Sequence, residues 1–152
     1  MKRTLLIFTF IFLIVSLTAC TEGKDIEINT MEKSPYDTLQ ENEEIIIEID
    51  EEVNKDTEII NVKLFNNSEK EYTYGKDHHL EKIVDNEWYV VSLLDNAAWE
   101  DIGLVSPAKS CSEIEFNIKF FYGELDSGKY RIVKSLYSDG EPTVVFAEFE
   151  IE

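Results

Sequence analysis

Apolar and polar residues alternate one by one in several short runs between residue 44 and the C-terminus. In the run 44–50, Ile45, Ile47 and Ile49 fall on one side of an extended chain, and acidic residues mark most of the other side. Successive side chains of a β-strand point to opposite faces, so this period of two is typical of a strand with one buried face. The pattern predicts strands at 44–50, 58–66, 111–120 and 144–151. In the third of these runs the inward residues are expected to be Ile114, Phe116, Ile118 and Phe120.

The remaining runs extend this strand pattern without adding a long helix. An irregular strand is predicted from residue 71, followed by a hairpin from 80–84 and 88–93 with the turn residues Asp85-Asn86-Glu87 between them. A further strand is predicted at 131–137. The segment 95–110 is the least regular, and a short helical turn carrying Trp99 is predicted within it. About seven short antiparallel strands separated by turns predict an all-β fold, an immunoglobulin-like β-sandwich.

The segment from Leu125 to Tyr130 resembles the tyrosine corner of immunoglobulin-like sandwiches. In that motif the tyrosine ring packs in the core and its hydroxyl group bonds back to the preceding loop. The resemblance implies this structural role for Leu125, Gly128 and Tyr130, and Gly128 suits a sharp approach because glycine tolerates a positive φ. A Ser-Gly hairpin with an incidental tyrosine is the alternative.

The N-terminus has the pattern of an exported protein. Lys2 and Arg3 precede the apolar run 5–17, which is too short for a membrane span and typical of the apolar region of a signal peptide. The sequence Leu-Thr-Ala-Cys that ends at Cys20 resembles the bacterial lipoprotein box, in which cleavage precedes a cysteine whose thiol is acylated. This resemblance implies a mature chain that begins at Cys20 and is held by fatty acids, such as palmitate, at the extracytoplasmic face of the cell membrane. An ordinary signal peptide followed by a chance cysteine is the alternative.

Three parts are therefore predicted: a lipoprotein signal peptide at 1–19, a lipid-anchored acidic stalk at 20–42, and the β-sandwich domain at 43–152. The stalk prediction depends on composition, because this stretch mixes charged and polar residues around Pro35 and shows no apolar period. We expect it to be disordered and to separate the domain from the lipid.

The charge of the chain limits its partners. Asp and Glu number 32 against 14 Lys and Arg, and the predicted signal peptide contains no acidic residue. A strongly acidic surface repels nucleic acid and anionic lipid head groups, so neither is an expected partner. The expected partners are the membrane, through the lipid on Cys20, and a protein at the cell envelope. Edge strands and the loops at the sandwich ends are the expected contact surfaces.

No metal site or cofactor is predicted. His78 and His79 are adjacent and would point to opposite faces of a strand, so we expect solvated turn residues rather than a chelating pair. Acidic turns at 51–52, 85–87 and 139–141 leave open a Ca²⁺-dependent or cation-sensing regulatory domain as the alternative function, although none matches an EF-hand loop.

No catalytic residues are predicted either, because the chain lacks the nucleophile, zinc-protease and phosphate-loop motifs. Acylation of Cys20 would leave Cys111 as a free thiol, which we expect to be a small buried filler. Several aromatic residues can serve either the core or a protein interface. They are Tyr72, Tyr74, Trp99, Phe121, Tyr122 and Tyr137.

From about residue 44 to the end, the chain resembles the bacterial Ig-like domains of secreted and membrane-attached proteins from low-GC Gram-positive bacteria. The resemblance implies a fold for binding or structure at the cell envelope and no agreed chemistry. The antibody cysteine pair is missing, so the core must replace the disulfide. The matching residues are Tyr74-Gly75, Leu80-Glu81-Lys82, Trp88-Tyr89, Pro107, Tyr122-Gly123, Leu125, Gly128-Lys129-Tyr130-Arg131-Ile132 and Glu148-Phe149-Glu150-Ile151.

Overall fold

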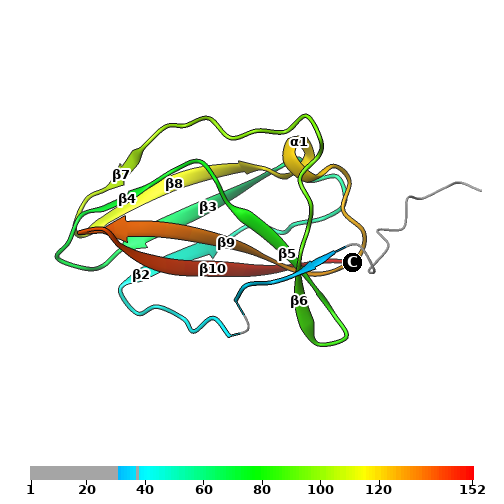
Figure 1. Cartoon of the computed structure of the whole chain (residues 1–152), viewed down its shortest axis with the longest axis horizontal. Helices are drawn as coiled ribbons and strands as arrows, with labels where there is room; N and C mark the ends of the chain where they lie inside the picture. The colour runs from blue at the N-terminus through cyan, green and yellow to red at the C-terminus, as the bar shows by residue number, and fades with distance from the viewer. Residues whose placement is uncertain (1–30, 37) are drawn as a thin grey trace, which may run out of the picture.

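The computed structural model describes residues 31–36 and 38–152 (Figure 1). The predicted signal peptide and Cys20 lie outside the described residues. Within that part, the chain forms ten β-strands and one short helix. They are β1 (Glu32–Lys33), β2 (Ile45–Ile49), β3 (Ile59–Asn66), β4 (Tyr72–Tyr74), β5 (His79–Val84), β6 (Glu87–Val90), β7 (Leu104–Ser106), β8 (Ser110–Asn117), α1 (Ile118–Tyr122), β9 (Gly128–Ser138) and β10 (Glu141–Ile151).

Two antiparallel sheets make up the fold. The larger has the order β1-β6-β5-β9-β4-β7, with β10 also paired to β9, and the smaller has the order β2-β3-β8. The predicted all-β sandwich is therefore confirmed, with ten strands in place of about seven. The strands that the sequence did not predict include β1 and β7, neither longer than three residues, whereas β4 lies in the stretch predicted as an irregular strand.

One apolar core joins the two sheets. On β3, Ile60, Val62 and Leu64 are buried while Ile59 is 41% exposed, as the alternation predicts. The same core receives Leu80 from β5 and side chains from β9 and β10. On β3 the period of two in the sequence therefore appears directly as burial, whereas residues 130–134 of β9 are all buried.

The predicted strand at 111–120 is wrong at its C-terminal end. The side chain of Asn117 accepts a hydrogen bond from the Phe120 backbone N–H at 3.0 Å and caps α1. The chain therefore leaves the extended conformation after Asn117, since a capping amide satisfies an N–H group that the sheet would otherwise bind. Ile118 is buried as predicted, but Phe120 is 53% exposed instead of facing the core. The predicted helical turn at 97–102 is also absent, and that segment is irregular.

The stalk prediction is wrong for residues 32–36. In that stretch β1 pairs with β6, and the Ser34 backbone N–H donates to the Trp88 carbonyl at 2.9 Å. The side chain of Ser34 is buried. Two interactions bind this segment to the sheet. β1 covers the edge of β6, which would otherwise be unpaired, and oxygen atoms of Ser34 and Tyr36 form hydrogen bonds with buried polar groups of the sheet.

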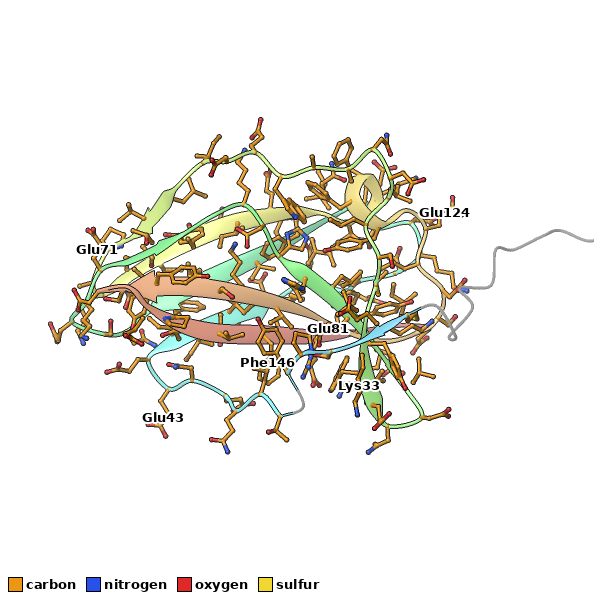
Figure 2. The ribbon with its side chains drawn as sticks, viewed as in Figure 1. Lys33, Glu43, Glu71, Glu81, Glu124 and Phe146 are labelled. Carbon is orange, nitrogen blue, oxygen red and sulfur yellow. The ribbon has the colours of Figure 1, made fainter. Side chains whose placement is uncertain are left out.

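Those polar groups are a buried ion pair on the outward face of the larger sheet. Arg131 of β9 lies opposite Glu81 of β5, and its Nε donates to Glu81 Oε2 at 2.6 Å. The Ser34 hydroxyl donates to Glu81 Oε1 at 2.7 Å, and Arg131 donates to the Tyr36 carbonyl at 3.1 Å. The guanidinium also lies 4.3 Å from the centre of the Trp88 ring. Figure 2 shows Glu81 in the region where the N-terminal segment crosses the sheet.

A chain that begins at residue 40 is expected to be less stable than one that begins at residue 31, by about 1–3 kcal/mol. The shorter chain loses β1 and the hydrogen bonds of Ser34 and Tyr36 to Glu81 and Arg131. A hydrogen bond to a charged group contributes about 1.5–3 kcal/mol, and the conformational entropy that the lost segment no longer gives up on folding offsets part of the sum. Urea unfolding of the two chains measures the difference. A chain that begins at residue 37 serves as the control, because it loses the same contacts and should match the shorter chain; equal stability of all three chains would contradict the role of this segment.

Among the described residues, no helix has the length and apolar character needed to cross a membrane.

Candidate binding groove

An open groove lies beside β8, between the smaller sheet and the irregular segment that precedes β7. In the described part of the chain β8 pairs with β3 alone, so its other edge is free. Residues of β8, of the loop between β4 and β5, of the segment 98–100 and of α1 all line the groove. In Figure 1, α1 lies close to the irregular segment, and the Leu94 backbone N–H donates to the Phe121 carbonyl at 2.8 Å. Ile59 and Asn61 of β3, Tyr74 of β4 and Leu104 of β7 complete the lining, so stretches that are distant in sequence build the groove together with the continuous segment of β8 and α1.

Aromatic rings form one wall of the groove. The Trp99 and Phe121 rings stack with their centres 3.6 Å apart, and Phe120 meets Phe121 edge to face at 4.9 Å. Trp99 and Phe121 are half-buried, whereas Phe120 is exposed. Partly exposed, rigid aromatic side chains in a concave site are typical of binding surfaces, because they offer a large contact area at little entropic cost.

His78 is buried among these rings where it lines the groove, so the expectation of a solvated turn residue is wrong for it. Its ring centre lies 4.3 Å from that of Trp99 and 4.4 Å from that of Phe116. Burial among these rings lowers the pKa of His78 from 6.5 to about 3, and the imidazole is neutral at pH 7. The neighbouring His79 is exposed, and the two histidines do not converge on one site.

One nitrogen of His78 has no partner. Nδ1 lies 3.4 Å from the Lys76 carbonyl oxygen, so the tautomer that donates to this oxygen carries its proton on Nδ1. Nε2 then presents a lone pair. Among the described residues, His78 Nε2 and Ser106 Oγ are the buried side-chain polar atoms without a hydrogen-bond partner. A buried acceptor without a donor is uncommon in a folded protein and needs a reason.

The loop that carries His78 is fixed by a buried lysine. Lys134 Nζ donates to the Gly75 carbonyl at 2.7 Å and also to the Asp77 carbonyl. Burial lowers the pKa of Lys134 to about 8. These two bonds hold the loop between β4 and β5 against β9 and thereby place the His78 ring.

The rim of the groove is acidic. Glu113 and Glu115 are exposed on β8 and line the groove, and in the described part of the chain neither forms an ion pair. Glu100 also lines it and pairs with Lys76. The net charge of the groove therefore has the same sign as that of the whole chain.

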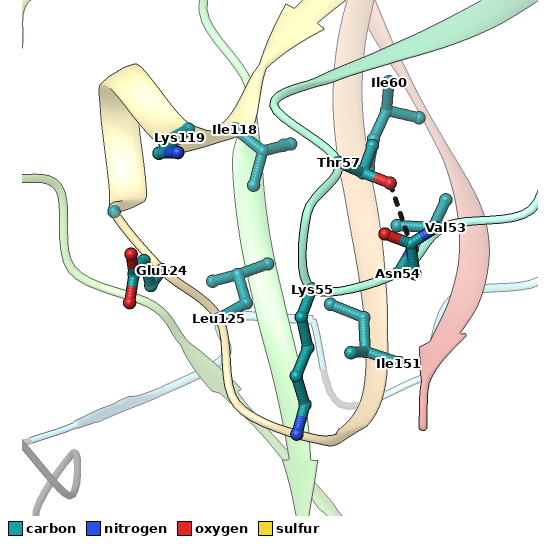
Figure 3. A pocket seen from close by; sticks show the side chains of 11 residues that line it. Val53, Asn54, Lys55, Thr57, Ile60, Ile118, Lys119, Glu124, Leu125 and Ile151 are labelled. Carbon is teal, nitrogen blue, oxygen red and sulfur yellow. Dashed lines mark hydrogen bonds between the residues drawn. The ribbon is translucent and has the colours of Figure 1, made fainter. Parts of the chain in front are cut away.

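Of the three residues of the predicted tyrosine corner, Leu125 precedes β9, and Gly128 and Tyr130 lie in its first three residues. The Tyr130 hydroxyl donates to the Asp126 carbonyl at 2.8 Å, and the buried Tyr130 ring stacks on Phe149 with centres 5.5 Å apart. Gly128 has a φ of 148°, where a side chain would be strained. Leu125 lines a small hollow with Ile60 and Ile151, which has room for about one water molecule (Figure 3).

The other residues singled out in the sequence are dispersed. Tyr72, Tyr74 and Tyr122 belong to the core, and Tyr137 is 46% exposed. Cys111 is exposed on β8, so the expectation of a buried filler is wrong.

In each of the acidic turns at least one carboxylate contacts a side chain of this chain. Glu87 pairs with Lys33 at 2.8 Å, Asp139 lies 3.6 Å from Lys70, and Glu51 accepts from Asn61. In residues 31–36 and 38–152, no group of three or more His, Cys, Asp or Glu side chains is arranged to hold a metal ion.

No pattern in the sequence indicates that His78, Trp99 and Phe121 lie together. The only signal for the groove was the cluster of apolar residues in the irregular segment 97–102, which has no alternation and so cannot belong to a strand.

Comparison with known proteins agrees with the architecture. A family model described as "Bacterial Ig-like domain" matches residues 40–150, a range that contains β2 to β9 and nearly all of β10. No curated protein and no solved structure is significantly similar to the chain. The family match spans well over half of the chain. The protein therefore belongs to the family of bacterial Ig-like domains.

Proposed function

We propose that this protein is a lipid-anchored binding module, which displays its Ig-like domain on the extracytoplasmic face of the cell membrane. Ig-like domains of bacteria serve binding or structural roles and are generally not catalytic. The observation that carries the binding function is the open groove beside β8, where Trp99, Phe120 and Phe121 expose aromatic surface next to a free strand edge. An apolar, partly exposed surface of this kind is costly unless a partner covers it.

The anchoring part of the proposal depends on Cys20 and on the short distance from it to the domain. Eleven residues, 21–31, lie between Cys20 and β1. A chain of that length spans at most about 40 Å when extended. Since β1 is part of the larger sheet, the domain is expected to stay closer to the membrane than a stalk ending at residue 42 would allow.

Replacement Cys20→Ala is expected to release the protein into the medium or to leave it unprocessed, because the acylated thiol is then missing. Fractionation of cells that express the full chain measures this, and Cys111→Ala is the matched control that should remain in the membrane fraction. A Cys20→Ala protein that stays processed and membrane-bound would contradict the anchor.

The exposed Cys111 also reports on which side of the membrane the domain lies. A membrane-impermeant maleimide added to intact cells is expected to label the wild-type chain at Cys111 and to leave Cys111→Ala unlabelled, since the lipid blocks Cys20. Labelling that occurs only after lysis would place the domain in the cytoplasm and would overturn the proposed location.

A further inference from the structure

Three features of the groove favour the same kind of ligand group. The first is charge: Glu113 and Glu115 stand on β8 without an ion-pair partner among the described residues, in a chain with a net charge of −18. Such a surface attracts positive groups and repels negative ones over roughly a Debye length, about 8–10 Å in physiological salt.

The second feature is the aromatic wall. Trp99 and Phe121 stack on each other, so a ligand meets only the sides of the rings that are turned away from this contact. The face of an aromatic ring carries the negative part of its quadrupole, and a cation placed near it is attracted. Tryptophan is the best of the aromatic side chains in this role. Because Trp99 is only half-buried, part of its surface is available to a ligand.

The third feature is the unpaired nitrogen of His78. Its side chain is 4% exposed and lines the groove, and Nε2 offers a lone pair that no donor among the described residues satisfies. An N–H group from a ligand would supply the missing donor. An ammonium or guanidinium group carries several such donors and no acceptor.

The free edge of β8 adds a requirement on the backbone of the ligand. β8 has eight residues and no proline, so its outer edge presents a row of N–H and C=O groups to the groove. An extended peptide can add to such an edge as a further strand, with its main chain supplying affinity and its side chains supplying specificity.

We propose that the groove binds an extended, basic segment of a partner protein, which pairs with β8 and places a Lys or Arg side chain against Trp99 and His78. The proposal depends on the binding function proposed above and names the chemistry of its partner. Glu113 and Glu115 neutralise the cationic side chain and its neighbours, and the His78 Nε2 accepts a hydrogen bond from it. The acidic rim at the same time rejects acidic segments.

The test uses the full chain in non-ionic detergent and three ten-residue peptides of alternating Thr and Val. The peptides differ only at one central position, which is Lys, norleucine or Glu. Calorimetric titration is expected to show that the Lys peptide binds about tenfold or more tightly than the norleucine peptide, because it alone makes the charged hydrogen bond. The Glu peptide is expected not to bind.

Two double replacements and one single replacement locate the site. The double replacement Glu113→Lys and Glu115→Lys is expected to weaken binding of the Lys peptide by about tenfold or more, through like-charge repulsion. The control double replacement Glu141→Lys and Glu150→Lys makes the same change in net charge at exposed positions of β10 and should leave binding nearly unchanged. His78→Phe keeps a ring among its aromatic neighbours and should abolish the preference for Lys over norleucine.

Some results would overturn the proposal. They are equal binding of the Lys and norleucine peptides, equal weakening by the two double replacements, or no saturable binding at about 1 mM peptide. If His78→Phe still bound the Lys peptide more tightly than the norleucine peptide, His78 Nε2 would not be the acceptor of the hydrogen bond from the Lys side chain. None of these results bears on membrane fractionation or on Cys111 labelling, so a failure here is distinguishable from a failure of the proposed lipid-anchored display.

Discussion

Replacing Arg131 with alanine is expected to lower the free energy of unfolding by about 3–5 kcal/mol, the usual cost of removing one partner of a buried ion pair. The variant leaves the Glu81 carboxylate, which has no exposed surface, without its counterion. The Ser34 hydroxyl still donates to Glu81, but one neutral donor cannot replace a guanidinium at 2.6 Å. Trp88 and Phe146 also lose the guanidinium that lies between them.

The matched control is Lys119→Ala. Lys119 pairs with Glu58 at 2.8 Å, but both side chains are at least half exposed, so the loss of this pair should change stability little. Urea unfolding followed by circular dichroism measures both variants. The double replacement of Arg131 by Met and Glu81 by Leu is expected to recover most of the loss, because no buried charge then remains unpaired. If Arg131→Ala were as stable as Lys119→Ala, Glu81 would not depend on Arg131 as its counterion, and the assignment of a buried ion pair would be wrong.

Acidification from pH 7 to pH 4 is expected to lower the free energy of unfolding by about 3 kcal/mol through His78. Burial among Trp99, Phe116 and Tyr122 holds the pKa of His78 near 3 in the folded protein, against 6.5 in the unfolded chain. Between these values the unfolded chain binds the proton and the folded protein does not, so stability present above pH 6.5 falls as the pH drops towards 3. Each pH unit in this window costs about 1.4 kcal/mol.

The charges near His78 act in both directions and are smaller than the effect of burial. Lys134 lowers its pKa further, whereas Asp77 and the Lys76 carbonyl raise it. Unfolding curves at pH 7, 5.5 and 4 should show that His78→Phe is less sensitive to acid than the wild type. His79→Phe, which changes the exposed neighbour, serves as the control and should keep the wild-type dependence. Equal acid sensitivity of the two variants would mean that His78 is not buried as a neutral ring.

The location of the groove follows from the short helix that ends the predicted strand at 111–120 early. Had β8 continued to residue 120, Phe120 would face the core and Phe121 would point away from it. The Asn117 cap instead starts α1, which exposes Phe120 and stacks Phe121 on Trp99. A single amide hydrogen bond thus keeps Phe120 out of the core and places both phenylalanines at the groove. The alternation of apolar and polar residues does not distinguish the two conformations, because the same residues after Asn117 can continue the strand or form a capped helical turn.

The sequence by itself determined the sandwich class and the places of most strands. In runs such as 45–49 and 60–64 every second residue is apolar, and a strand shows this period of two whatever it later packs against. The tertiary structure alone decided which polar residues are buried. Arg131 and Glu81 are far apart in sequence, and only the pairing of β5 with β9 sets them opposite each other under the segment of Ser34. The same holds for His78, whose solvated appearance in the sequence is reversed by rings from β8, α1 and the irregular segment. Burial of a polar side chain depends on partners distant along the chain, and local patterns carry no information about them.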